Sequence, residues 1–150
     1  MITAQELSAY PIVYKGEFAE VYDMSAEIPG VAFAFWRGFF SLENPTFIKE
    51  MNDSVDEIKK RGIKVFISDH SYLKLVKDDV LQWLHDNWYT GAYQNGLVAE
   101  LSIDAKSIFG KLSLEKMLNE AKMGGVVSVK VHDLEDGKKA AKQFCEKAAV

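Results

Sequence analysis

The sequence predicts a single α/β domain over residues 1–150, with a mixed, mostly parallel sheet, an N-terminal antiparallel hairpin and about four helices. Short apolar segments rich in Val, Ile and Phe recur along the chain and have the character of strands. From Asn44 onward they alternate with longer segments whose apolar residues follow helical spacing. Strands joined by helices run parallel, with right-handed crossovers.

The first third of the chain predicts three strands. Residues 11–15 and 18–24 flank Gly16, and this short gap indicates a hairpin. Residues 31–36 follow a Pro-Gly turn and are apolar at every position. Because a strand that is apolar on both sides belongs in a sheet covered on both faces, we expect residues 31–36 inside the sheet and the hairpin at one edge.

Helix signals separate the remaining strands. Asn44 is expected to cap the first helix, and Gly62 to end it. The other three helices are expected over residues 78–94, from a Ser113 cap to Gly124, and after an Asp133 cap. The strands between the helices are expected over residues 63–68, 97–103 and 126–131, with irregular loops over 69–77 and 104–111.

Polar residues follow the carboxyl ends of two of these strands. Asp69, His70 and Tyr72 come after one strand, and Asp104 comes after the next. Ligands of parallel α/β sheets bind beyond the carboxyl ends of the strands. A ligand site, if the protein has one, is therefore expected at these four residues; the alternative is an ordinary polar loop.

Three aromatic residues on the second helix divide between core and surface. At helical spacing, Trp88 falls within the apolar stripe and Trp83 at its margin, whereas Tyr89 lies roughly opposite and is expected to be exposed. Core packing accounts for Trp88. Because aromatic side chains concentrate in protein contacts, Trp83 and Tyr89 are candidates for a partner surface or a pocket wall.

The composition argues against several classes of function. Lys and Arg total 18 against 22 Asp and Glu, for a net charge of −4, whereas nucleic-acid binding requires a basic surplus. No apolar run approaches the ~20 residues of a membrane span, and the first residues do not resemble a signal peptide. The single cysteine, Cys145, has no partner for an internal disulfide. We therefore expect a cytoplasmic protein with no nucleic-acid partner.

The chain contains no motif for catalysis, metal binding or cofactor binding. Asp69-His70-Ser71 has the residue types of a catalytic triad, but neighbours in an extended segment point in alternating directions and cannot converge. The three histidines lack metal-ligand spacing, and no glycine-rich phosphate loop occurs. We therefore expect no metal, no cofactor and no enzymatic activity.

Several segments between about residues 30 and 145 together resemble a known family. They are Phe35-Trp36-Arg37-Gly38, Ile67-Ser68-Asp69, Trp83-Leu84 to Asn87-Trp88, Gly96 to Ala99, Phe109-Gly110-Lys111, and Val131 to Ala140. Their order and spacing are similar to the SpoIIAA-like branch of the STAS/SEC14-type proteins, small bacterial proteins related to anti-sigma-factor antagonists. The resemblance implies a SpoIIAA-like fold.

The resemblance also implies a non-enzymatic regulatory or protein-interaction module. Relatives bind a partner protein under the control of a phosphorylated serine at the start of the second core helix. Here Asp78 and Asp79 stand at that helix start and the serine signature is absent. The two carboxylates either mimic the phosphorylated state or simply stabilise the helix N-terminus.

A second functional reading is a binder of a small apolar ligand or lipid. It is supported by the SEC14-type resemblance and by an aromatic-rich sequence that includes Phe33, Phe35, Phe39 and Phe40. The strands of the N-terminal hairpin also leave an edge that could pair with a second copy as a homodimer.

Overall fold

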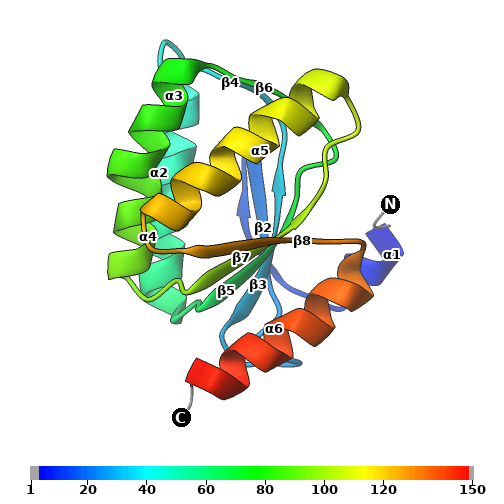
Figure 1. The fold of residues 1–150 in the computed structure, drawn as a ribbon. Helices are drawn as coiled ribbons and strands as arrows, with labels where there is room; N and C mark the ends of the chain where they lie inside the picture. Colours follow the sequence, from blue (N-terminus) through cyan, green and yellow to red (C-terminus); the bar gives the residue numbers. More distant parts are fainter. Residues whose placement is uncertain (1–3, 149–150) are drawn as a thin grey trace.

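A six-stranded sheet forms the centre of the computed structural model, which describes residues 4–148 (Figure 1). In spatial order its strands are β1 (Ile12–Lys15), β2 (Ala19–Asp23), β3 (Val31–Trp36), β5 (Val65–Asp69), β7 (Ala99–Ile103) and β8 (Val127–Val131). The pairs β1–β2 and β2–β3 are antiparallel, whereas β3 to β8 are parallel. The predicted mixed α/β sheet with an antiparallel start is confirmed.

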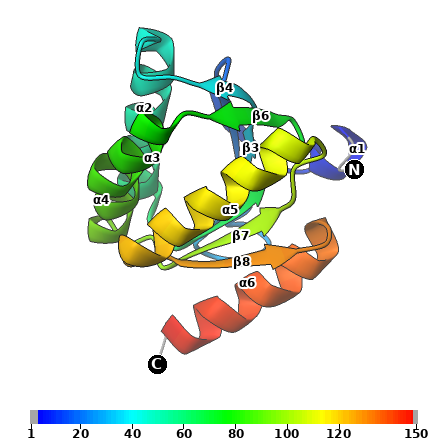
Figure 2. The same cartoon turned by 45° about the horizontal axis from the view of Figure 1, so that its top comes forward.

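Helices cover both faces of this sheet (Figures 1 and 2). One face carries α2 (Pro45–Arg61), α5 (Ile108–Met123) and a continuous helical segment made of α3 (Asp78–Trp83), the π-helix η1 (Leu84–Tyr89) and α4 (Thr90–Gln94). The other face carries α6 (Leu134–Ala148), together with Leu7 from the short α1 (Ala4–Leu7). As expected, β3 is therefore enclosed on both sides.

A second, two-stranded parallel sheet extends beyond the main one (Figure 2). It pairs β4 (Gly38–Phe40) with β6 (Leu73–Val76). The expectation of an irregular loop over residues 69–77 is wrong for β6. Leu73 and Val76 are buried while the two residues between them are exposed, so β6 lacks the alternation that identifies a strand in a sequence. We call this pair the β4–β6 ribbon.

Helix α2 has the caps that the sequence predicts for it. The Asn44 side chain accepts a hydrogen bond from the Thr46 amide at 3.0 Å, and Gly62 ends the helix in the left-handed conformation with φ of 65°. Inside α2, the buried Glu50 carboxylate accepts hydrogen bonds from the backbone amides of residues 17, 18 and 19 at 2.9–3.1 Å. This carboxylate fixes the hairpin turn against α2, and with it the outer end of the sheet.

The expected Ser113 cap of the third helix is wrong, because α5 begins earlier. Ser107 is the cap and accepts a hydrogen bond from the Gly110 amide at 2.9 Å. Ser113 lies inside the helix, where its hydroxyl accepts a hydrogen bond from the Val76 amide at 3.0 Å. Gly110 is needed for packing, since a Cβ there would lie 2.3 Å from the Leu73 carbonyl oxygen. The first turn of α5 therefore packs directly against β6.

The expected exposure of Tyr89 is also wrong. Its side chain is 1% exposed and packs edge-on against Trp88 with ring centroids 5.0 Å apart. The cause is η1, whose wider turn places more residues in each revolution than an α-helix does. This change of phase rotates Tyr89 from the expected outer side toward the sheet, while Trp88 stays buried as predicted.

Candidate functional site

A pocket of about 370 Å³ lies at the carboxyl ends of β5, β7 and β8, where the sequence predicts a site. Asp69 and Asp104 both line it. Their carboxylates are already bonded to the backbone: Asp69 accepts the Ser71 amide and Asp104 the Ala105 amide, each at 2.8 Å. The Asp69 bond spans two residues, as in a tight turn, so Asp69 shapes the connection after its strand.

His70 and Tyr72 do not line this pocket. His70 is fully buried on the opposite face of the sheet, beneath η1. Tyr72 is 49% exposed, and the ammonium of Lys106 lies 4.8 Å from its ring centroid. The candidates drawn from residues 69–72 are thus separated, because successive residues of an extended chain point to opposite sides.

The remaining predicted site residues do not form one site either. Asp78 and Asp79 are exposed in the first turn of α3, where Asp78 lies 3.5 Å from the Lys116 ammonium. Trp83 is half-buried and packs against Phe47 with ring centroids 6.1 Å apart. Among the predicted aromatic candidates, neither Trp83 nor Tyr89 offers a freely exposed ring.

The sequence reading missed a group of exposed apolar side chains on the β4–β6 ribbon and the first turns of α5. We call this group the apolar surface. Its members are Phe39, Tyr72, Leu75, Ile108, Phe109 and Leu112, with exposed fractions from 36% to 76%. The ribbon and α5 are adjacent because Gly110 lies against Leu73 and Ser113 bonds Val76. Apolar residues scattered singly are normal on a protein surface, whereas six on neighbouring elements are unusual.

A helical spacing in the sequence could have revealed half of this surface. Ile108, Phe109 and Leu112 share the outward side of α5, while Gly110 and Ser113 face inward. The pattern is visible only once the helix start is placed at Ser107. A start at Ser113 assigns these residues to a loop, where apolar spacing carries no information.

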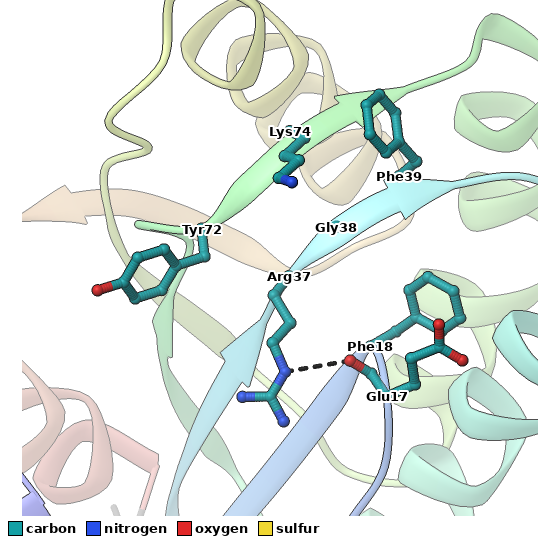
Figure 3. Close-up of a pocket in the computed structure, with 7 residues that line it drawn as sticks. All are labelled: Glu17, Phe18, Arg37, Gly38, Phe39, Tyr72 and Lys74. Atoms are coloured by element: carbon teal, nitrogen blue, oxygen red, sulfur yellow. Dashed lines mark hydrogen bonds between the residues drawn. The ribbon is translucent and has the colours of Figure 1, made fainter.

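A groove of about 450 Å³ borders the apolar surface, between the ribbon and the hairpin turn (Figure 3). Phe39 and Tyr72 stand at its two ends, and Gly38 and Lys74 lie between them (Figure 3). Arg37 is held by the chain itself: its Nε donates to the Glu17 carbonyl at 3.1 Å, and an Nη donates to Glu20 at 2.9 Å. The groove is therefore preformed rather than dependent on a ligand.

Lysines accompany the aromatic rings at this site. Lys74 lies 5.8 Å from the Phe39 ring centroid, and Lys106 lies over the Tyr72 ring. Both ammonium groups remain at the exterior, since both lysines are exposed. In a protein with a net charge of −4, this combination of apolar rings and lysines differs from the average surface.

Perturbed titratable groups occur inside the molecule, away from this surface. Burial raises the pKa of Glu100 to about 7 and lowers the pKa of His70 to about 3. Shifts of this size often mark active sites. Here both groups line an enclosed cavity of only about 10 Å³, which excludes any organic substrate.

Comparison with known proteins does not assign the chain to a family, since no family model and no curated protein matches it. Within residues 4–148, no group of three or more His, Cys, Asp or Glu side chains is placed to bind a metal ion. In the same residues, no helix has both the length and the apolar character needed to cross a bilayer. The function of the protein must therefore be inferred from the geometry of its structure.

Proposed function

We propose that the protein is a non-enzymatic regulatory or interaction module that binds an acidic, amphipathic segment of another protein. The observation that carries this proposal is the apolar surface beside a preformed groove. Aromatic and large aliphatic side chains supply most of the binding energy at protein interfaces when they become buried. Lys74 and Lys106 favour a partner whose polar side is acidic.

A protein segment fits this site better than a bilayer does. The groove is concave and carries the Glu17 carboxylate on one wall, and Asp78 and Asp79 stand exposed just beyond the end of β6. Carboxylates at this position repel an anionic membrane, whereas a peptide can match mixed charges residue by residue. Binding of an apolar ligand or lipid is the alternative that the experiment must separate.

The resemblance to SpoIIAA-like proteins supports the same proposal, because their better-known relatives act by binding a partner protein. Asp78 and Asp79 lie at the start of the helix that carries the switch in those relatives, and β6 leads directly into it. We propose that these carboxylates stand in for a permanently phosphorylated state. The Lys116 ammonium on α5 lies 3.5 Å from the Asp78 carboxylate, which connects this helix start to the helix that bears Phe109.

The test compares surface variants as baits. Phe39→Ser and Phe109→Ser remove apolar side chains that are 59% and 69% exposed, so both variants should fold as the wild type does. Tyr93→Ser is the matched control, because Tyr93 is 53% exposed on α4. Wild-type and control baits should retain the same partner from the native cell, and its docking segment, mapped by peptide truncation, should be acidic and amphipathic. Phe39→Ser and Phe109→Ser, the two apolar-surface variants, should lose that partner.

A vesicle experiment separates the alternatives. Sedimentation with vesicles containing anionic lipid should leave the wild-type protein in the supernatant. If the wild type sediments with these vesicles and Phe109→Ser does not, the surface binds lipid and the protein-partner proposal is wrong. Equal retention of one partner by the wild type, Phe39→Ser and Phe109→Ser would also contradict the proposal.

A further inference from the structure

Polar side chains are enclosed on the sheet face beneath η1 and α5. The indole Nε1 of Trp36 donates to the Ser68 hydroxyl at 2.9 Å, and that hydroxyl donates to Glu100 Oε2 at 2.8 Å. These three residues come from β3, β5 and β7, and Trp36 and Glu100 each lie two residues out of register with Ser68, so the hydrogen bonds cross the sheet diagonally. His70, the residue after β5, points to the same side and is 0% exposed.

This hydrogen-bonded chain ends at atoms with no protein partner. Glu100 Oε1 and both ring nitrogens of His70 are buried without a hydrogen bond. Leaving such atoms unpaired is costly, and native proteins satisfy nearly all of them with protein or ordered water. The same two residues line the enclosed cavity of about 10 Å³ under Trp88 and Tyr89.

We infer that this cavity is a binding site for one water molecule, which bridges Glu100 Oε1 and a ring nitrogen of His70. The volume allows one water, and the two walls supply the two or more polar partners that a buried water requires. This inference concerns the interior and is independent of the proposed docking function. The Trp36–Ser68–Glu100 hydrogen bonds already join β3, β5 and β7. The water extends this polar network to His70.

The hydrogen-bond donors and acceptors on the cavity wall fit a water molecule better than an ion. Ser68 donates to Glu100 Oε2, which leaves Oε1 to carry the proton of the carboxylic acid and donate it to the water oxygen. The water in turn donates to the unprotonated nitrogen of a neutral His70 ring. The remaining walls are apolar or aromatic, so a cation would lack the six oxygen ligands typical of Mg²⁺ or Ca²⁺.

The test is a crystal structure of the full chain at a resolution that orders internal water, with three variants. A single water peak should lie within hydrogen-bond distance of His70 and Glu100 in the wild type and in Glu100→Gln. It should disappear in Glu100→Leu, which removes one polar wall. Ser102→Ala is the matched control, because the buried Ser102 hydroxyl is also unpaired but does not line the cavity. The water between His70 and Glu100 should therefore remain in this variant.

Oxygen-17 relaxation dispersion gives the same answer in solution, where the wild type should hold one more long-lived water than Glu100→Leu. The wild-type and Glu100→Gln structures decide the matter even if Glu100→Leu does not fold. An empty cavity in the wild type, or a direct hydrogen bond between His70 and Glu100, overturns the inference.

Discussion

The two faces of the central sheet are equally buried and chemically different. Toward α6, the central strands β3, β5 and β7 present an apolar core: Val31, Phe33, Val65, Ile67, Ala99 and Leu101. Toward α2, η1 and α5, the same strands present Ser68, Glu100 and Ser102, and Ser128 follows on β8. A one-residue step along β5 or β7 therefore exchanges an apolar environment for a hydrogen-bonded one.

This difference shows how the molecule separates stability from polar organisation. The α6 face gains stability mainly from apolar burial, since the central strands place an apolar core on it. The opposite face pairs part of its polar groups through indoles: Trp36 Nε1 donates to the Ser68 hydroxyl, and above the sheet Trp88 Nε1 donates to the Ser54 hydroxyl of α2 at 2.8 Å. Substitutions on the two faces should therefore differ in size, in pH dependence and even in sign.

The largest effect is expected on the apolar face. Phe33 is 0% exposed, with its ring centroid 4.9 Å from that of Phe35. Phe33→Ala removes this packing and should lower the free energy of unfolding by about 3–5 kcal/mol at every pH. Urea unfolding at pH 5 and pH 8 measures the change. A loss below about 1 kcal/mol, or one that varies with pH, would show that this face is not a simple apolar core.

The continuous apolar run over residues 31–36 was sufficient to predict a sheet covered on both faces, and capping residues were sufficient for α2 and α6. Asn44 and Gly62 mark α2, and Asp133 accepts the Asp136 amide at 2.9 Å at the start of α6. These signals are local, since each depends on residues within one turn of a helix. The strand boundaries are likewise within about two residues of those expected from apolar runs.

Features that depend on distant packing could not be predicted. Gly110 resembles a helix breaker until β6 is seen against it, and β6 pairs only with the three-residue β4. The π-helix that buries Tyr89 has no sequence signature of its own. Of the candidate site residues, Asp69 and Asp104 lie together as the sheet topology predicts. The apolar surface was not predicted because its residues lie at the unexpected β4–β6 ribbon and on the part of α5 before Ser113.

An intermediate effect, dependent on pH, is expected for Glu100→Gln. Burial raises the native pKa of Glu100 from 4.5 to about 7, so the native state holds a proton that the unfolded state releases between these pH values. The Glu100 contribution to stability therefore falls as pH rises from about 4.5 to 7. The glutamine variant lacks this loss and should exceed the wild type by about 3 kcal/mol at pH 8, but by little at pH 4. Chemical unfolding of both proteins across this range measures the difference.

His70 is the control for the Glu100 prediction, because burial shifts its pKa so that stability changes with pH in the opposite direction. Its pKa falls from 6.5 to about 3 on burial, so the native state binds fewer protons than the unfolded state between these values. Its contribution to stability is fully present above pH 6.5 and is lost as pH falls toward 3. Glu100→Gln should therefore retain a rise in stability up to about pH 6.5, whereas His70→Gln should lose that part of the rise. Parallel curves for the two variants would contradict both assignments.

The smallest effect on stability is expected for serine-to-alanine substitutions on the polar face. They test whether the position of a hydroxyl, rather than its polarity alone, decides if its removal stabilises or destabilises the fold. Ser68 and Ser102 are register neighbours on β5 and β7 and are both 0% exposed, but only Ser68 has hydrogen-bond partners. Ser68→Ala leaves the Trp36 indole and Glu100 Oε2 without their partner and should destabilise the fold by about 1–3 kcal/mol. Ser102→Ala removes an unpaired hydroxyl and should be neutral or stabilising by about 1 kcal/mol. The two substitutions delete the same atom at adjacent sites. Equal destabilisation in thermal unfolding would therefore mean that both hydroxyls are paired. The polar network would then extend along β7 from Glu100 to Ser102.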